Sequence, residues 1–345
     1  MRRTAIYALT KAGAELGCRL SKELGADLFL HKRCHGPEGA MHFESLRRIV
    51  EANFLGYDAH VFIAATGIVV RVIAPLITSK DRDPAIVVLD QMGKFCISLL
   101  SGHMGGANAL ARQIASITGG QAVITTATDA AGITSVDVVA KERDMAIGNI
   151  EAVKTVNGAM LAGEVVQIFD PEDRLGLVGQ GHCGEIMLEI VDSLEQWQPS
   201  VPGIRVSWKR AKYEPSTLVL HPRCLVAGIG CNRNTPAEEI LEVIKEVFHQ
   251  NNLALSSLKA LASIDAKRDE AGLIQAAQVL NTELLFFNKE ALGAIMVPNP
   301  SERVKFHMGV DSVCEAAAIL ATGKGNLIVP KTKTKNVTVA VALGP

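Results

Sequence analysis

The chain has 345 residues, of which 48% are hydrophobic and 21% charged, and its formal net charge is -1. This length predicts two or three domains at roughly 150 residues each, and the hydrophobic content excludes global disorder. The charge balance excludes bulk electrostatic attraction to nucleic acid or to an anionic membrane, although a local basic cluster can still hold an acidic small molecule.

Short apolar runs alternate with helical patterns over residues 1–145. Several of these runs show little polar alternation, which is typical of strands buried on both faces of an α/β sheet. We therefore expect a βαβ layout with three layers, α/β/α, in which helices cover both faces of a mainly parallel sheet. The expected strands are TAIYAL (4–9), ADLFLH (26–31), HVFIAAT (60–66), AIVVLD (85–90), KFCISLL (94–100) and QAVITT (121–126).

Two further segments follow this first domain. Residues 146–218 contain a helical stretch at 153–164 and an apolar run at 165–170, which together predict a small α+β middle domain. From 219 to 345 the α/β pattern returns, with a strand expected at 224–230 and a helix at 236–250. Thr235 is the expected N-cap of that helix and Pro236 lies in its first turn. Helices at 272–280 and 312–321 and a strand at 336–343 complete a second α/β domain.

The seven cysteines are scattered and include no C-x-x-C pair. We therefore expect reduced thiols in a cytoplasmic protein, with neither a disulfide framework nor a zinc site. Lys11 and Glu15 interrupt the apolar core that a signal peptide would need. Because no uncharged apolar run reaches about 18 residues, no membrane span is expected either.

The stretch SGHMGGAN (101–108) places His103 at a turn between an expected strand and an expected helix. Gly102, Gly105 and Gly106 let backbone amides approach a ligand closely, and a helix N-terminus presents unpaired N–H groups. Such a turn can hold a carboxylate or an oxyanion, and a neutral imidazole beside it can act as a base. The alternative is a histidine that caps its own helix, with the glycines needed only for packing.

Three other polar turns follow expected strands in comparable places. They are Thr66 and Gly67 with Arg71 one turn into the next helix, Asp90, and the run 125–129. Ligands of open α/β sheets bind outside the carboxyl ends of the strands, so we expect the four turns to line one crevice. The simpler alternatives are a solvated helical arginine at Arg71, and turn-forming or N-capping residues at the other positions.

In the third segment, GIGCNRNTPAEEI (228–240) precedes the expected helix at 236–250. It does not predict nucleotide binding, because Arg233 replaces the third glycine of G-x-G-x-x-G. Arg233 is nevertheless placed to bind an acidic group at the helix N-terminus. Lys267 lies in the charged stretch SIDAKRDEAG (263–272), for which a solvated loop is the alternative.

Several of these stretches resemble a known family. Residues 63–129, including SGHMGGAN, resemble nearly end to end the amino-terminal domain of the cobalt-precorrin-5A hydrolases, the CbiG family of anaerobic cobalamin synthesis. VAGIGCNRNTPAEEI (226–240), SIDAKRDEAGLIQAA (263–277) and VDSVCEAAAIL (310–320) resemble that family's carboxy-terminal domain. This second domain is shared with a stand-alone protein of the aerobic pathway.

The resemblance implies hydrolysis of a δ-lactone on ring A of a cobalt-containing tetrapyrrole, followed by loss of the bridging carbon and its methyl group as acetaldehyde. It implies no added cofactor and no metal site, since the cobalt belongs to the substrate. His103 is the candidate base, Asp90 and Asp129 are further candidates for proton transfer, and the Gly105 and Gly106 amides are the candidate oxyanion site. The candidate substrate-binding residues are Thr66, Gly67, Arg71, Ser101, Gly102, Gly105, Gly106, Asn108, Thr126, Arg233 and Lys267, with Lys80 as a further cation.

A different class of function is a non-catalytic protein that binds or transfers tetrapyrrole intermediates of the same pathway. The occurrence of the second domain as a separate protein keeps this alternative open. A homodimer and transient contacts with other enzymes of cobalamin synthesis are further expectations, whereas nucleic acid and membrane are not expected partners.

Overall fold

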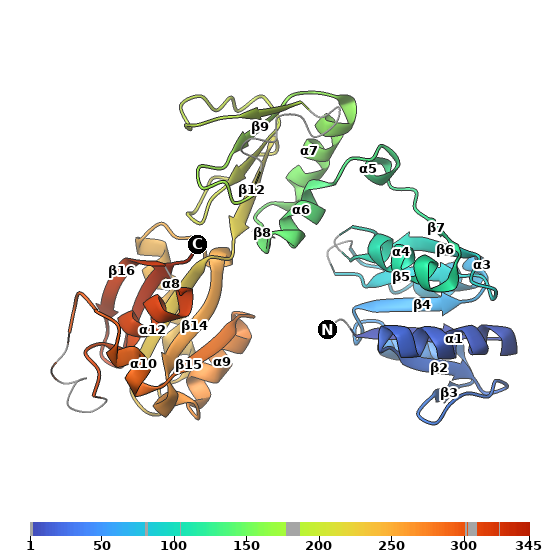
Figure 1. The fold of residues 1–345 in the computed structure, drawn as a ribbon, viewed down its shortest axis with the longest axis horizontal. Coiled ribbons are helices and arrows are strands. Elements are labelled where there is room, and N and C mark those ends of the chain that lie inside the picture. Colours follow the sequence, from blue (N-terminus) through green and yellow to red (C-terminus); the bar gives the residue numbers. More distant parts are fainter. Residues whose placement is uncertain are drawn as a thin grey trace. The chain divides into compact units, whose positions relative to one another are not determined.

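The computed structural model describes residues 3–79, 82–103, 105–176, 187–300, 302, 309–323 and 325–345. The chain divides into two compact units, Met1–Val138 and Val139–Pro345. In the described ranges the first unit contains a seven-stranded sheet and the second contains two five-stranded sheets (Figure 1).

The sheet of the first unit has the strand order β3-β2-β1-β4-β5-β6-β7. Its neighbouring strands are parallel except for β5 and β6, so the expectation of a mainly parallel sheet is confirmed. The strands are β1 Thr4–Ala8, β2 Asp27–His31, β3 Met41–Phe43, β4 Ala59–Ile63, β5 Ala85–Leu89, β6 Phe95–Leu100 and β7 Gln121–Val123. The short edge strand β3 is not among the strands that the apolar runs predicted.

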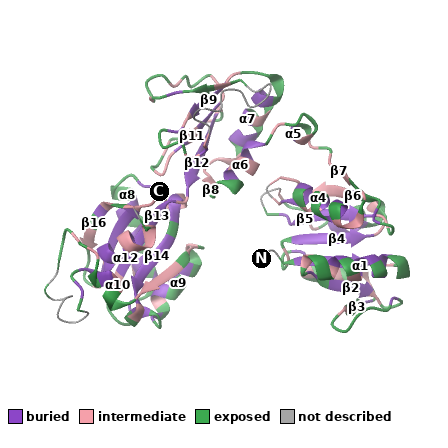
Figure 2. Ribbon diagram, viewed as in Figure 1, coloured by how far each residue is buried: buried purple, intermediate pink, exposed green. Residues whose placement is uncertain are grey.

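Helices cover both faces of this sheet. Helices α1 (Lys11–Leu24) and α4 (Ala107–Thr118) pack on one face, and α2 (Leu46–Asn53) and α3 (Thr66–Ile73) pack on the other. All residues of β1, β4 and β5 are consequently buried, and Figure 2 shows β4 in the purple of buried residues. The three-layer α/β/α arrangement predicted from the apolar runs is confirmed.

The direction of β6 decides which turns share an edge of the sheet. Leu100 at the carboxyl end of β6 pairs with Ile86 near the amino end of β5. The turns after β6 and β7 therefore lie at one edge, and those after β1, β4 and β5 lie at the opposite edge. The expectation that four polar turns line one crevice is wrong, because residues 90–94 form a connection too short for the crossover that a parallel pair needs.

The second unit has two sheets, in the orders β10-β9-β11-β12-β8 and β15-β14-β13-β17-β16. Helix α7 packs on the former, while α8 and α9 lie on one face of the latter and α10 and α12 on its other face. The strands are β8 Met145–Ile147, β9 Val166–Phe169, β10 Leu188–Ile190, β11 Gly203–Val206, β12 Thr217–Pro222, β13 Leu225–Cys231, β14 Leu258–Ile264, β15 Glu283–Phe287, β16 Asn326–Lys333 and β17 Val337–Leu343. The helices are α7 Ile150–Ala162, α8 Ala237–Gln250, α9 Ala271–Val279, α10 Lys289–Gly293 and α12 Val313–Thr322, and the short α5 Ala127–Ala130 and α6 Val136–Glu142 precede them in the chain.

Two local details of the second unit differ from the sequence-based expectation. Strand β12 runs across residue 218, where a domain boundary was expected. Helix α8 begins at Ala237 with Pro236 as its N-cap residue, and the Thr235 hydroxyl donates instead to the Asn232 carbonyl oxygen. The side chain of Thr235 therefore closes the preceding turn and does not cap the helix.

The cysteines in the described ranges are all free thiols, and Cys183 lies outside those ranges. None of the described helices is long and apolar enough to cross a lipid bilayer.

A buried histidine belongs to the aromatic core between the first sheet and helices α2 and α3. His60 is fully buried and stacks on Phe54, with ring centroids 5.7 Å apart. Its Nε2 lies 3.1 Å from the Phe54 carbonyl oxygen, which can only accept, so Nδ1 accepts from the Tyr7 hydroxyl at 3.2 Å. Burial lowers the pKa of His60 to about 4.

We expect this histidine to make the first unit less stable in acid. The unfolded chain takes up a proton near pH 6.5 that the folded protein binds only near pH 4, so stability falls as the pH drops between these values. By pH 5.0 the loss amounts to about 2 kcal/mol. Urea unfolding at pH 7.5 and 5.0 should show this extra loss in the wild type relative to His60→Gln, and an equal pH dependence of the two proteins would contradict it.

Candidate active site

The loop between β6 and α4 is folded by its own backbone hydrogen bonds. The Ser101 carbonyl oxygen accepts from Ala107 N–H at 3.1 Å, and the Gly102 carbonyl oxygen accepts from Asn108 N–H at 3.0 Å. The His103 carbonyl oxygen accepts from Gly106 N–H at 2.9 Å. The expected oxyanion site at Gly105 and Gly106 is therefore wrong for Gly106, whose amide is already donated within the loop.

Ser101 and the glycines set the shape of this loop. Ser101 has a φ of 55°, and its hydroxyl donates to the Asp83 carbonyl oxygen at 2.9 Å, which ties the loop to the amino end of β5. Gly106 has a φ of 87°, a left-handed conformation that glycine adopts without a steric penalty. A Cβ on Gly102 would lie 2.7 Å from Asn108 Oδ1, and one on Gly105 would lie 2.6 Å from the Ser101 carbonyl oxygen.

We expect Gly105→Ala to displace the loop because the added Cβ meets backbone and Cβ atoms that cannot swing away. The expected cost is about 1–3 kcal/mol of unfolding free energy. The shift of His103 should lower kcat/KM about tenfold or more. Gly158→Ala in α7 is the matched control, since a Cβ there meets nothing within 4 Å. Wild-type kinetics in Gly105→Ala would contradict the role given to this loop.

His103 lies between two carboxylates at this edge of the sheet. Its Nε2 is 2.9 Å from Asp129 Oδ2 and 3.2 Å from Thr128 Oγ1. Its Nδ1 is 3.7 Å from Asp137 Oδ2, which is too long for a hydrogen bond. The side chain is 18% exposed, so the ring is largely enclosed while part of it stays open to solvent.

Asp129 is the centre of the hydrogen-bond network around His103. Besides His103, its carboxylate accepts from Asn108 Nδ2 at 2.8 Å and from the Arg112 guanidinium. Partial burial raises the pKa of Asp129, but the hydrogen bonds from Arg112 and His103 outweigh it and hold the pKa below its usual value. Asp129 therefore stays ionised at neutral pH and can only accept.

This arrangement selects one tautomer of His103. Because Asp129 only accepts, the proton of a neutral imidazole resides on Nε2, and Nδ1 carries the lone pair. In the described part of the chain Nδ1 has no hydrogen-bond partner. The cluster therefore positions a base with its backing carboxylate, the arrangement that catalytic histidines need.

The predicted residues Asn108 and Thr126 belong to the same cluster. Asn108 is 4% exposed, accepts from Ser98 Oγ at 2.6 Å and donates to Thr126 Oγ1 at 3.0 Å. Its buried amide thus connects β6, α4 and the turn after β7. The side chain of Asn108 positions Asp129 by donating to its carboxylate. Thr126 accepts from the same amide group, so we assign it a structural contact and not a contact with substrate.

Two further residues of the cluster, Arg112 and Asp137, were not among the candidates drawn from the sequence. Thr128, which contacts His103, lies in the polar run 125–129 that the sequence offered. Arg112 lies one helical turn after Asn108, so the two side chains share a face of α4. This i, i+4 spacing could have identified Arg112 from the sequence. Asp137 is separated from His103 by more than thirty residues and has no comparable local signal.

A pocket of about 250 Å³ opens beside the loop at the same edge of the sheet. It is lined by Tyr57, Asp58, Arg82, Asp83 and Gly105, among others. Arg82 supplies a cation beside the His103 loop, close to the amino end of β5, whereas the sequence interpretation expected Arg71 to share a crevice with His103. Arg71 itself lies on α3 at the opposite edge, and its guanidinium donates to the Gly67 carbonyl oxygen at 2.9 Å.

The other candidates at the opposite edge are Thr66, Gly67 and Asp90. The Asp90 carboxylate accepts from Met92 N–H at 2.8 Å and from Phe95 N–H at 2.7 Å. These bonds close the turn between β5 and β6, so the turn-forming alternative for Asp90 is confirmed. Its assignment as a catalytic partner of His103 is wrong, because the two turns flank opposite ends of β5 and β6.

Arg233 and Lys267 lie in the second unit and already have acidic partners. Arg233 Nη1 lies 2.5 Å from Asp269 Oδ1, and the buried Lys267 ammonium lies 3.3 Å from Glu270 Oε2. Each cation thus has a carboxylate partner, at the surface for Arg233 and in the interior for Lys267, and an incoming anion would have to compete with that carboxylate. Lys80, the remaining candidate cation, lies outside the described residues. No group of three His, Cys, Asp or Glu side chains with the geometry of a metal site occurs in the described ranges.

Three family models match consecutive parts of the chain. They are Cobalamin synthesis G N-terminal over residues 48–129, Cobalamin biosynthesis central region over 134–222, and Cobalamin synthesis G C-terminus over 225–342. Together they cover most of the 345 residues.

Named relatives agree with these matches. The chain is 31% identical over 354 residues to the cobalt-precorrin-5A hydrolase of Priestia megaterium, which covers 99% of this chain and 95% of that protein. It is 34% identical over 346 residues to that of Salmonella typhimurium, which covers 98% and 97%. Protein CobE of Sinorhizobium sp. is 36% identical over 124 residues, or 35% of this chain and 80% of that protein. The chain therefore belongs to the cobalamin synthesis G family, CbiG, which confirms the resemblance of its SGHMGGAN loop and its carboxy-terminal segments.

Proposed function

We propose that this protein is a cobalt-precorrin-5A hydrolase of cobalamin biosynthesis, which opens the ring A δ-lactone of its substrate and releases acetaldehyde. The names of relatives that match almost the full length support this assignment. The observation that carries the chemistry is the pair of His103 and Asp129, 2.9 Å apart at a partly open edge of the sheet. It provides the base that hydrolysis of a lactone requires.

The first step is the addition of water to the lactone carbonyl. His103 Nδ1 takes a proton from the water while Nε2–H stays hydrogen-bonded to Asp129. The imidazolium that forms lies between the carboxylates of Asp129 and Asp137, which stabilise its charge. The ring C–O bond then breaks, and the departing alkoxide takes the proton from His103, which leaves a carboxylic acid and an alcohol.

The second step is the cleavage of a carbon–carbon bond. His103 Nδ1 removes the proton of the new alcohol, whose C–O bond becomes the carbonyl of acetaldehyde. The bond to the macrocycle breaks, its electron pair stays on the ring carbon, and His103 returns the proton to that carbon. One histidine thus serves both steps because it is restored to its neutral form after each one.

The remaining groups at this edge are assigned to positioning. Arg112 and Asn108 hold Asp129 in place, and Arg82 beside the loop is the candidate partner for a carboxylate of the macrocycle. The reaction as written needs no added cofactor, since the cobalt belongs to the substrate. We assign the protein to the cytoplasm, and the free thiols of the cysteines in the described ranges support this.

The test is an assay of acetaldehyde release by the purified protein. Incubation with cobalt-precorrin-5A should yield one acetaldehyde per substrate, measured with NADH-linked alcohol dehydrogenase, and a product whose mass matches loss of that fragment after uptake of water. Tight binding of the substrate without acetaldehyde would refute the hydrolase and support a carrier of pathway intermediates.

A further inference from the structure

An arginine in the second unit is half-buried without a partner. Arg205 lies on β11, the central strand of the first five-stranded sheet, where it is paired in register with Phe169 and Val219. Its Nε is buried and has no hydrogen-bond partner. In the described part of the chain its guanidinium forms no ion pair. Glu214 acts on it only at longer range and lies 3.5 Å from the Lys212 ammonium.

An unpaired guanidinium in a sheet is costly to bury, because it gives up hydration without gaining a counterion. Burial accordingly lowers the pKa of Arg205. A buried polar group without a partner in a folded protein needs an explanation, and completion by a bound ion or ligand is one of them. Arg205 is therefore a candidate for binding an anion that comes from outside the chain.

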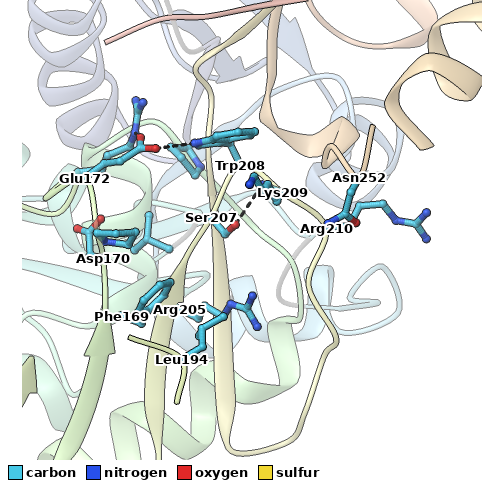
Figure 3. A pocket seen from close by; sticks show the side chains of 14 residues that line it. Phe169, Asp170, Glu172, Leu194, Arg205, Ser207, Trp208, Lys209, Arg210 and Asn252 are labelled. Atoms are coloured by element: carbon cyan, nitrogen blue, oxygen red, sulfur yellow. Dashed lines mark hydrogen bonds and ion pairs between the residues drawn. The ribbon is translucent and has the colours of Figure 1, made fainter. Parts of the chain in front are cut away.

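The surroundings of Arg205 form a pocket of about 270 Å³ (Figure 3). Phe169, Leu194, Val206 and Pro222 supply apolar walls. Figure 3 shows the Arg205 side chain beside Phe169 and Leu194, extending away from Asp170 and Glu172. The guanidinium thus lies at a pocket with apolar sides, and the two acidic residues do not face it.

The other charges of the pocket leave it with an excess of cations. Glu172 accepts from both Arg174 Nε and Trp208 Nε1 at 2.6 Å, so its charge is satisfied. Lys209 rests over the Trp208 ring at 5.0 Å, and in the described ranges neither Lys209 nor Arg210 forms an ion pair. The Asp170 Oδ1 atom is buried without a partner and can accept from a ligand hydroxyl or N–H group.

We propose that this pocket binds an alkyl carboxylate, with the carboxylate on the Arg205 guanidinium and the methylene chain against Phe169 and Leu194. A guanidinium matches the planar fork of a carboxylate, and apolar walls match methylene groups better than they match a fully hydrated phosphate. The pocket holds one arm of a larger molecule and is too small for a whole macrocycle. That the arm belongs to the tetrapyrrole substrate or product rests on the proposed function, whereas the carboxylate class does not.

The test is a binding titration that reports on this pocket alone. The chain has two tryptophans, so Trp197→Phe leaves Trp208, which lines the pocket, as the single reporter. In this background uroporphyrin III, a tetrapyrrole with eight carboxylates, should quench the fluorescence, and glutarate should displace it at a lower concentration than inorganic phosphate. Arg205→Leu should raise the apparent Kd about tenfold or more, since a charge-assisted pair is lost. The matched control Arg19→Leu, which removes an exposed arginine of α1, should change it less than twofold.

Thermal unfolding of the same variants separates a binding role from a structural one. A group held ready for a ligand is costly in the free protein, so Arg205→Leu should melt at or above the wild-type temperature. The proposal is overturned by unaltered probe binding in Arg205→Leu, by a large loss of its stability, by absence of binding to the wild type, or by phosphate displacing the probe as well as glutarate does. The proposed hydrolase fails separately, through the absence of acetaldehyde from the wild type.

Discussion

His103→Ala is expected to lower kcat for acetaldehyde release by about 10²–10⁴-fold, the usual contribution of a positioned general base. The loss should fall on kcat more than on KM, because the imidazole moves protons and is not the group assigned to hold the macrocycle. The measurement is steady-state acetaldehyde release, with substrate affinity determined separately by absorbance titration. The loss has a structural basis, since no other imidazole in the described ranges lies in the network around Asp129.

Thermal unfolding of His103→Ala distinguishes a loss of the base from a loss of the fold. Without His103, Asp129 keeps its hydrogen bonds from Asn108 and Arg112, so the unfolding transition should stay cooperative and the melting temperature should shift by only a few degrees. His42→Ala, at an exposed position of β3, is the matched control and should keep wild-type kinetics. A folded His103→Ala protein with normal turnover would refute the role of His103 as the base and leave its imidazole as a structural partner of Asp129.

Asp129→Asn should cost a similar factor, about 10²–10⁴ in kcat, for a different reason. An asparagine amide can donate to His103 Nε2, which favours the tautomer with the proton on Nδ1 and removes the lone pair that the mechanism uses. Arg112 loses its anionic partner at the same time. Because Asp129 does not contact the substrate in the proposed mechanism, KM should change little.

The control for Asp129→Asn is Asp192→Asn, which changes an exposed carboxylate in the second unit without touching the network. It should leave both kcat and KM at wild-type values. A decisive comparison is Asp90→Asn, at the opposite edge of the first sheet. If it lowered kcat as much as Asp129→Asn does, the reacting bond would lie at that edge and the assignment to His103 would be refuted.

Much of the fold of the first unit could be predicted because its strands are buried on both faces. Runs such as AIVVLD have no polar alternation, and β5 is buried at every position, as a strand between two helical layers must be. The edge strand β3 was missed because it has three residues, two of them exposed, and its composition resembles a loop. Hydrophobic periodicity thus reports the central strands well and the edges poorly.

The site could be predicted only in part. The glycine-rich turn between an expected strand and an expected helix indicated His103 and Asn108. The polar run after β7 indicated Thr126 and Asp129. The structure brings these four together. Asp137 was missed because a lone carboxylate at the start of a helix is usually a solvated or capping residue. Its approach to His103 depends on how the chain returns after β7, which no local pattern encodes.

The sequence by itself determined the fold class, the buried strands of the first sheet and the family, because apolar periodicity and the SGHMGGAN loop are local properties of the chain. Only the tertiary structure decided that β6 runs against β5, so that His103 and Asp129 share one edge of the sheet while Arg71 and Asp90 occupy the other. It also decided which charges have partners, with Arg233 and Lys267 paired and Arg205 left without one. Strand direction and ion pairing depend on residues far apart in the chain, and they are settled by packing of the whole unit.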